Sequence, residues 1–296
     1  MNFPFTAKTL TLRNGLVASW YEFGDPAGRP LFFFHGWPGS GAQGLFLHEM
    51  GLKHGVRIIS PERPGFGEAS PKPGRTFTDW PEVVGQIADS LGLGKFHIMG
   101  MSGGGPYALV CGWAMPQRLH GVCVCCGAVP THTPEARRGL HPAYRFMLRL
   151  NDSSPGIILL ILRSISLVSR IPMPWWFMRL MMKLFLNDRD GMAMGNRPLF
   201  RLFEPSYLNA MKSGGRALFD DGLPYSKPWP FPVEEITVPV RHWHGTVDEN
   251  FHFDQAKQLA ARVPTATFFE REEGHYSLPL MHAEEILLDL MATQRA

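Results

Sequence analysis

The stretch FHIMGMSGGGP at residues 96–106 decides the fold. Residues 96–99 form a short apolar run typical of a strand buried on both faces, and Pro106 fits the first turn of a helix that follows. Between them, GMSGG at residues 100–104 matches G-x-S-x-G, in which a serine occupies a sharp turn from strand to helix. Small neighbours are required there because side chains would collide with adjacent elements. A glycine-rich turn with an incidental serine is the weaker interpretation, because both flanking elements are present. The stretch therefore predicts that Ser102 presents its hydroxyl above a sheet.

Apolar runs of the same kind recur on both sides of this unit. Residues 9–23 alternate polar and apolar side chains around Asn14-Gly15, which favours a tight hairpin. Further strands are predicted at residues 31–34, 56–59, 122–126, 237–243 and 265–269, and helices at residues 43–53, 79–91 and 106–115. Strands that alternate with helices predict an α/β fold with a mostly parallel, doubly wound sheet and helices on both of its faces.

The composition excludes several classes of protein. The chain has 296 residues, of which 45% are hydrophobic and 19% charged, so it can bury a large core. Its net charge of +3 comes without the dense basic runs of nucleic-acid binders. The N-terminus lacks the apolar core of a signal peptide, and four cations interrupt the apolar region 157–186, so no bilayer-spanning segment is expected. The sequence favours a cytoplasmic protein without an integral membrane segment.

The four cysteines, Cys111, Cys123, Cys125 and Cys126, lie close together in the sequence. Their spacing resembles neither a disulfide framework nor a zinc site. Free cysteine is among the most frequently buried residue types. We therefore expect these side chains to pack in the core.

Residues 131–225 form a helical insertion. This region has helix-like apolar periodicity without strands, and proline-rich joints at residues 130–134 and 224–232 bound it. The insertion carries 13 Lys and Arg against seven Asp and Glu, a net charge of +6, whereas the rest of the chain has a net charge of −3. The chain thus divides into an α/β core, residues 1–130 and 226–296, and a basic insertion.

Large apolar side chains cluster inside the insertion. They are expected to line a deep substrate pocket to which methionines adapt well: Trp175, Trp176, Met178, Met181 and Met182. The alternative is that they only pack helices together while arginine heads reach water. A basic and apolar surface is also compatible with peripheral contact with a membrane.

A serine hydroxyl needs a base that takes its proton and an acid that orients the base. Asp248 is the preferred acid because it directly follows the strand predicted to end near Trp243. Glu249 and Asp254 are alternatives that lie further from the end of that strand. Asp248 is therefore the candidate that orients the base.

His275 is the candidate base. It lies in the loop after the predicted strand 265–269, and the resulting order Ser102, Asp248, His275 is one in which such triads occur. His252 is too close to Asp248 in sequence, and His282 falls inside a helical pattern. We expect these three side chains to form a nucleophilic triad.

Two backbone N–H groups are candidates for holding a developing oxyanion. The residue after the nucleophile supplies one, which selects Gly103. The loop HGWPG at residues 35–39 follows the strand 31–34 and supplies the second. Trp37 is the expected donor because Pro38 has no N–H.

The motifs HGWPGS at residues 35–40, RPGFG at 63–67, GMSGGGPY at 100–107, GTVD at 245–248 and GH at 274–275 together resemble α/β-hydrolase fold serine hydrolases. The resemblance covers nearly the whole chain apart from the insertion. It implies an eight-stranded sheet, a helical cap inserted after the sixth strand, and hydrolysis without a cofactor. Two departures affect the loop beside the serine turn: Glu62 stands where relatives usually have Asp, and Ser70 lies one residue later than in the family.

These features predict a serine hydrolase that cleaves a carboxylic ester of a small to medium apolar substrate through an acyl-enzyme. The HGWP loop also resembles that of epoxide hydrolases, which, like haloalkane dehalogenases, use an Asp nucleophile; Ser102 argues against both. Cofactor-free haloperoxidases or perhydrolases and C–C bond hydrolases keep the serine triad and remain alternatives. A ligand receptor with this fold and little turnover is a further alternative.

Two patterns imitate other sites. Gly65-Phe66-Gly67, with Asp89 downstream, resembles a dinucleotide fingerprint but lacks its third glycine and its helix. Four residues could suggest a metal cluster, but their spacing fits no known ligand motif: His242, His244, Asp248 and His252. No metal and no cofactor are expected, and the expected partner is a small-molecule substrate.

Overall fold

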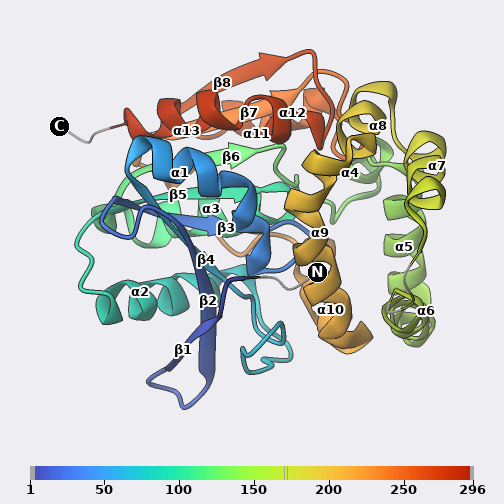
Figure 1. Ribbon diagram of the computed structural model, residues 1–296, viewed down its shortest axis with the longest axis horizontal. Helices are drawn as coiled ribbons and strands as arrows, with labels where there is room; N and C mark the ends of the chain where they lie inside the picture. Colours follow the sequence, from blue (N-terminus) through green and yellow to red (C-terminus); the bar gives the residue numbers. More distant parts are fainter. Residues whose placement is uncertain (1–3, 170, 172, 294–296) are drawn as a thin grey trace.

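The computed structural model describes residues 4–169, 171 and 173–293, and its strands form one eight-stranded sheet (Figure 1). The strands lie in the order β1-β2-β4-β3-β5-β6-β7-β8. Their bounds are β1 Lys8–Thr11, β2 Val17–Gly24, β3 Arg29–Phe34, β4 Val56–Pro61, β5 Phe96–Met101, β6 Leu119–Cys125, β7 Val240–Gly245 and β8 Ala266–Arg271. β2 is antiparallel to β1 and β4, and all other neighbours are parallel. The predicted fold class is confirmed.

The hairpin and β7 illustrate how local sequence sets the ends of strands. Gly15 has a positive φ of 81° in the turn between β1 and β2, a conformation that costs glycine little. β7 begins at Val240, three residues later than predicted. Pro239 directly precedes it and has no N–H to donate to a neighbouring strand. Its carbonyl instead accepts the N–H of Val122.

From β3 onward, helices lie between successive strands and after the last strand in the sequence. The α-helices outside the insertion are α1 His48–His54, α2 Trp80–Ser90, α3 Gly105–Ala114, α11 Phe253–Ala261, α12 Ser277–Met281 and α13 Ala283–Met291. Short 3-10 segments are η1 Gly41–Leu47, η2 Phe77–Asp79, η3 Ser102–Gly104, η4 Pro116–Arg118, η5 Leu223–Ser226 and η6 Val233–Glu235. The predicted helix 43–53 is wrong in its first half, which is the 3-10 segment η1. There, Gly44 approaches the ring of Phe23 so closely that an added Cβ would lie 2.9 Å from it.

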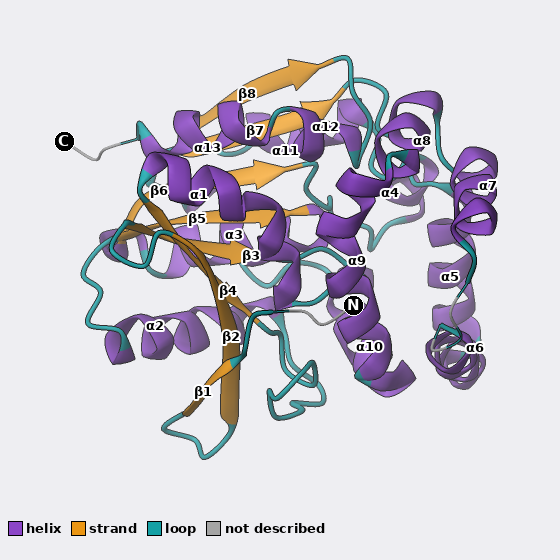
Figure 2. Ribbon diagram, in the orientation of Figure 1, coloured by secondary structure: helices purple, strands orange, loops and turns teal. Residues whose placement is uncertain are grey.

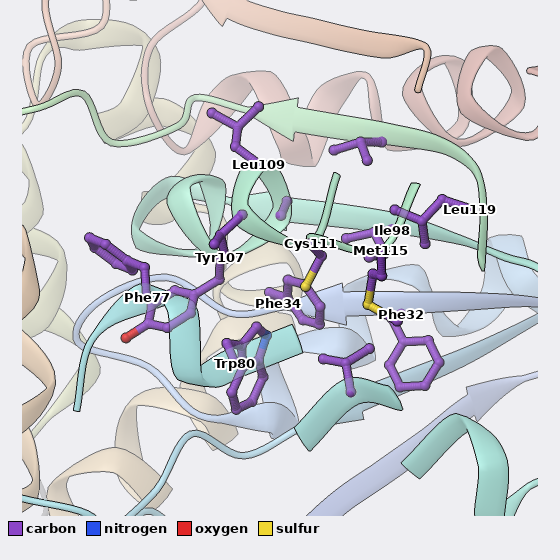
Figure 3. Close-up of a cluster of buried hydrophobic side chains, with 14 of the residues drawn as sticks. Phe32, Phe34, Phe77, Trp80, Ile98, Tyr107, Leu109, Cys111, Met115 and Leu119 are labelled. Carbon is purple, nitrogen blue, oxygen red and sulfur yellow. The ribbon is translucent and has the colours of Figure 1, made fainter. Parts of the chain in front are cut away.

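The core has two layers because alternate residues of each buried strand point to opposite faces. On β3, Phe32 and Phe34 join a cluster that contains side chains of α2, α3 and α11, while Leu31 and Phe33 join a second cluster with η1 and α13. Figure 3 shows the first cluster around Trp80. Burial of each such large side chain stabilises the fold by about 1.5–3 kcal/mol. The four cysteines are buried and free, as the spacing predicts.

Among the described residues, seven α-helices follow β6 and precede β7: α4 Pro134–Arg138, α5 Pro142–Ser153, α6 Pro155–Val168, α7 Trp175–Phe185, α8 Asp188–Gly195, α9 Arg197–Lys212 and α10 Gly214–Gly222. We call them the cap helices. They lie beyond the arrowheads of the central strands, at the carboxyl edge of the sheet (Figure 2). Within the described part of 131–225 there is no strand, although Leu140 forms an isolated bridge with Phe251. None of the described helices has the length and apolar character needed to cross a bilayer.

Candidate active site

Ser102 occupies the turn between β5 and α3 in a strained conformation. Its φ is +51°, in the left-handed region that non-glycine residues rarely adopt. The backbone passes so close to its neighbours that a Cβ added at Gly100 would overlap the carbonyl of Gly104, and one added at Gly104 would overlap that of Phe34. The glycines at these two positions therefore have a steric cause, and the turn directs the serine away from the sheet.

The structure brings the three predicted triad residues together. Nε2 of His275 lies 2.9 Å from Oγ of Ser102, and Nδ1 lies 2.9 Å from Oδ2 of Asp248. All three residues are buried. An ionised carboxylate only accepts hydrogen bonds, so the neutral ring carries its proton on Nδ1 and its Nε2 accepts from the serine hydroxyl.

Asp248 is itself held in place by the backbone. Its Oδ1 accepts the N–H groups of Asn250 and Phe251 at 2.8 and 3.0 Å. The competing acids Glu249 and Asp254 are exposed. The competing bases are occupied elsewhere or exposed: the His252 side chain is 58% exposed, and His282 pairs with Glu285.

Burial and neighbouring charges shift the pKa values of His275 and Asp248 in opposite directions. Burial disfavours the imidazolium form of His275, but the carboxylates of Asp248 and Asp190 outweigh that effect and raise the pKa of the imidazole. For Asp248, burial favours the neutral acid, but His275 outweighs it by charge and hydrogen bonding and lowers the pKa of the carboxyl. The pair is therefore arranged to stabilise an imidazolium beside a carboxylate.

The two predicted oxyanion donors are neighbours. A Cβ added at Gly103 would lie 3.0 Å from the backbone nitrogen of Trp37. Within the described part of the chain, the Trp37 N–H donates to no protein acceptor. The Tyr225 hydroxyl donates to the Gly103 carbonyl at 2.7 Å and helps to hold this turn. A substrate oxyanion beside Ser102 could therefore meet both N–H groups.

Arg63 holds the loop that carries Trp37. Its guanidinium donates to the carbonyls of His35 and Gly36 at 2.5 and 3.0 Å, and to both carboxylate oxygens of Asp221 on α10 at 2.7 Å. Arg75 also donates to Asp221, at 2.5 Å. All three ionised side chains are buried, so one compact network joins the loop at residues 35–39 to the cap helices.

The two departures from the family pattern are accommodated next to this network. Oε2 of Glu62 accepts the N–H of Gly41 at 2.8 Å, and burial raises the pKa of this carboxyl to about 7. Oγ of Ser70 accepts the N–H of Val17 on β2 at 2.9 Å. Glu62 thus attaches the loop to η1 and Ser70 attaches it to the sheet, and neither side chain has a hydrogen bond to the triad.

Asp190 on α8 is a site residue that the sequence analysis misses. It is buried, its Oδ2 accepts the N–H of His275 at 2.9 Å, and its Oδ1 accepts those of Tyr276 and Ser277 at 2.8 Å each. The residues 187–190, Asn-Asp-Arg-Asp, read only as a helix start, and Asn187 indeed caps α8. Its contact with the His275 loop arises from tertiary packing, for which the sequence carries no local signal.

A cavity of about 100 Å³ lies beside Ser102. Its walls are mostly apolar and come from the core and from α5, α6 and α10; they include Trp37, Val129, Tyr144, Ile158, Leu162 and Leu218. A volume of this size accommodates several water molecules or a short acyl group.

The predicted pocket residues do not line this cavity, so that prediction is wrong for the space beside Ser102. Trp175 and Met178 line a separate cavity of about 700 Å³ between α7 and α9, Trp176 is 68% exposed, and Met181 and Met182 line neither cavity. Helical periodicity identifies an apolar face but not the neighbour against which it packs. In the structure α7 packs against α8, and α5 and α6 cover the serine instead.

The four residues that suggest a metal cluster in the sequence, His242, His244, Asp248 and His252, are not the ones that the fold brings together: among the described residues a different group has close ligand atoms. Ligand atoms of Cys126, Asp248 and His275 lie within 4.8 Å of one another, but two of these residues are hydrogen-bonded together and burial raises the pKa of the Cys126 thiol. A protonated thiol is a poor metal ligand. Turns rather than a helix follow Gly67, so this loop has no helix N-terminus for a phosphate.

The sequence model of the alpha/beta hydrolase family matches residues 31–289. The chain is 25% identical to the bifunctional esterase/perhydrolase of Acinetobacter calcoaceticus, over 97% of this chain and 99% of the relative. It is also 25% identical to a non-heme chloroperoxidase of Streptomyces lividans, over 96% and 98% of the two chains. One similar solved structure is a thermophilic esterase from Thermogutta terrifontis, with a TM-score of 0.64, 19% identity and 97% of each chain covered. Another is a bromoperoxidase from Bacillus anthracis, with a TM-score of 0.69 and 21% identity, over 97% of this chain and 99% of the other. This chain belongs to the alpha/beta hydrolase family.

Proposed function

We propose that this hydrolase cleaves carboxylic esters of small to medium apolar substrates through a covalent acyl-enzyme on Ser102. The observation that carries the proposal is the unbroken chain of contacts from Ser102 through His275 to Asp248, each 2.9 Å long, beside an apolar cavity. A buried serine, imidazole and carboxylate at these distances have the geometry of a nucleophile, its base and the group that orients the base.

The proposed reaction has two halves. Oγ of Ser102 attacks the ester carbonyl while Nε2 of His275 takes the hydroxyl proton, and the N–H groups of Trp37 and Gly103 hold the resulting oxyanion. Collapse of this intermediate expels the alcohol, which takes the proton from His275. Water then attacks the acyl-enzyme with the same base, and Ser102 is released with a carboxylic acid.

The size and polarity of the cavity support a short apolar acyl group. A volume of about 100 Å³ accommodates only a few carbon atoms beside Ser102. The carboxylates of Asp248 and Asp190, which contact His275 or its loop, already have hydrogen-bond donors within the protein. No charged side chain is among the residues that line the cavity in the described part of the chain.

The proposal is tested with a panel of 4-nitrophenyl esters of increasing acyl length and with a fluorophosphonate probe. We expect acetate and butyrate esters to be cleaved faster than longer ones, and the probe to label the wild type. Ser102→Ala should lose both activity and label, whereas Ser19→Ala, which alters another buried serine on β2, should retain both. Ester cleavage or labelling that survives in Ser102→Ala would overturn the mechanism.

Perhydrolysis is a second candidate activity, favoured by the two curated relatives that match over nearly their whole length. In this reaction hydrogen peroxide replaces water as the attacker of the acyl-enzyme, and a peracid leaves instead of a carboxylic acid. It uses the same serine, so Ser102→Ala should abolish both activities. Peracid formation from acetate and hydrogen peroxide, compared with ester hydrolysis under matched conditions, decides which activity dominates.

C–C bond hydrolysis and ligand reception are the remaining alternatives. A C–C hydrolase would leave simple esters nearly untouched and cleave the C–C bond of a ketone substrate, again through Ser102. A receptor would bind ligand with negligible turnover of every ester in the panel. Adding a ketone substrate to the panel separates the C–C hydrolase from the receptor, and the complete set of measurements then distinguishes all four candidate functions.

A further inference from the structure

The outer side of α6 and α7 exposes large apolar side chains. These two helices lie at the edge of the molecule furthest from the sheet (Figure 1). We call this surface the α6–α7 face and define it by its exposed apolar residues: Ile157, Leu160, Leu167, Val168, Trp176, Leu180 and Leu184. Most of them are more than half exposed, although monomeric proteins rarely leave large apolar patches open to water.

The helix α6 is apolar on both sides. Its inner residues Ile158 and Leu162 are buried and line the cavity beside Ser102. Its outer residues Leu160 and Leu167 are 63% and 65% exposed. A surface helix of a water-soluble domain normally presents charged residues opposite its buried face. The outer side of α6 therefore has the composition of a covered surface.

On α7 the apolar residues form a regular stripe. Trp176, Leu180 and Leu184 are spaced four residues apart, so they lie on one side of the helix. Arg179 and Lys183 are exposed and lie next to this stripe with the same spacing. An aromatic and leucine stripe bordered by cations is typical of a helix that lies in the interface of a membrane.

The charge around the face has one sign. Between Asp152 and Asp188 the sequence has no acidic residue, while it has three arginines and a lysine. Arg163, Arg179 and Lys183 are exposed among the described residues, and none of their side chains takes part in an ion pair with a described carboxylate. The face thus offers unpaired positive charge beside apolar surface.

We propose that the α6–α7 face docks on an anionic lipid surface. Apolar side chains would enter the interface while Arg163, Arg179 and Lys183 contact phosphate groups, since each cation near such a surface strengthens binding. A second copy of the chain is a poorer occupant. A two-fold contact through this face would bring the same cations of both copies together without an acidic partner.

Docking has a consequence for the proposed reaction, although the docking itself is independent of it. Because α6 lies between the exposed face and the cavity, Ser102 would act directly beneath the lipid interface. Esters that dissolve poorly in water concentrate at such an interface. This inference goes beyond the proposed function by naming the surface at which the substrate is met.

Sedimentation with vesicles at low salt tests the proposal. We expect the wild type to sediment with vesicles of phosphatidylcholine and phosphatidylglycerol in equal parts, and much less with phosphatidylcholine alone. Arg179→Gln/Lys183→Gln should bind the mixed vesicles roughly thirtyfold more weakly. The matched control Lys95→Gln/Lys227→Gln, which removes two exposed lysines outside the cap helices, should bind like the wild type.

A second pair of variants tests whether the apolar side chains of the face contribute to vesicle binding. Leu180→Ser/Leu184→Ser should lose most vesicle binding. Leu52→Ser/Leu288→Ser, which changes two exposed leucines outside the cap helices, should keep it. Thermal unfolding checks that each variant is folded. Ser102→Ala should sediment like the wild type, so failure of docking and failure of the proposed chemistry are distinguishable.

Three results would overturn the proposal. The wild type could stay in the supernatant with mixed vesicles, or bind neutral and anionic vesicles equally well at every salt concentration. In the third case, analytical ultracentrifugation would show a dimer that Leu180→Ser/Leu184→Ser dissociates while vesicle binding is unchanged. That outcome would assign the face to contact between two copies.

Discussion

At the scale of single residues, the proposed chemistry depends on the proton of His275. The base must be neutral to take the hydroxyl proton of Ser102, and the nearby carboxylates of Asp248 and Asp190 raise the pKa of the imidazole despite its burial. The His244 ring also faces Asp248, but burial lowers the pKa of His244, so it adds no positive charge near neutral pH. Protonation of His275 therefore sets the acid limit of activity.

We expect the acid limb of the kcat/KM profile to lie above pH 6.5, the ordinary value for histidine. Activity should rise with pH through the pKa of His275 in the folded protein. The same raised pKa stabilises the fold below about pH 6.5, and this contribution is lost as the pH rises through the folded value. A limb centred below pH 6.5 on a soluble acetate ester would contradict this assignment.

Asp190→Asn should shift that acid limb to lower pH and reduce kcat by roughly ten- to hundredfold, with little change in KM. The amide is uncharged, and its NH₂ group would face N–H donors from residues 275–277 that now meet a carboxylate. Asp188→Asn, an exposed change on the same helix, is the matched control. A lower melting temperature with an unmoved acid limb would mean that Asp190 contributes to folding alone.

At the scale of elements, α6 limits the acyl group that fits beside Ser102. Leu162→Ala should widen the cavity and raise the ratio of kcat/KM for a hexanoate ester over an acetate ester. The loss of a buried leucine should also cost about 2–5 kcal/mol of stability. Leu109→Ala on α3 is the control, because this residue is equally buried but does not line the cavity. An unchanged ratio in Leu162→Ala would show that another wall limits the acyl chain.

The same scale shows what the sequence can and cannot predict. The central strands follow from short apolar runs, and the turn at Ser102 follows from the glycines around the serine, of which Gly100 is required by a local contact with Gly104. Asp248 and His275 could be selected because each follows a predicted strand. By contrast, the placement of Trp175 and Met178 depends on which helices α7 packs against, and that of Asp190 depends on a contact 85 residues away in sequence. Local sequence does not show which neighbour a helix face packs against or which distant residues come into contact, so those parts require the fold itself.

At the scale of the whole molecule, the buried network of Arg63, Arg75 and Asp221 joins the core to the cap helices. Burial opposes ionisation of Asp221, but the two arginines outweigh it and lower the pKa of the carboxyl to about 2. Its contribution to stability is therefore present above about pH 3.8 and is lost as the pH falls towards 2. The attachment of the cap is thus expected to weaken only in strong acid.

Asp221→Asn should destabilise the protein by about 3–5 kcal/mol near neutral pH, because it leaves two buried guanidinium groups without their carboxylate. Urea unfolding of the variant and the wild type measures this difference. Asp89→Asn, at an exposed ion pair with Arg118, should change the stability by less than about 1 kcal/mol. A loss of similar size in both variants would contradict the importance of the network.

The contact of Asp190 with the loop of His275 also links the position of α8 to the position of the proposed base. If α8 moved away from the sheet to admit a substrate, it would break its three hydrogen bonds to that loop and draw the base away from Ser102. A swing of α8 in each catalytic cycle, on the microsecond to millisecond scale of domain motions, would therefore require the triad to reassemble before the chemical step. Entry by rotations of side chains such as Tyr144 and Phe251, which line the cavity, would instead leave the triad assembled. Association by this second route should accordingly be a single fast phase, limited by how often a substrate meets the opening.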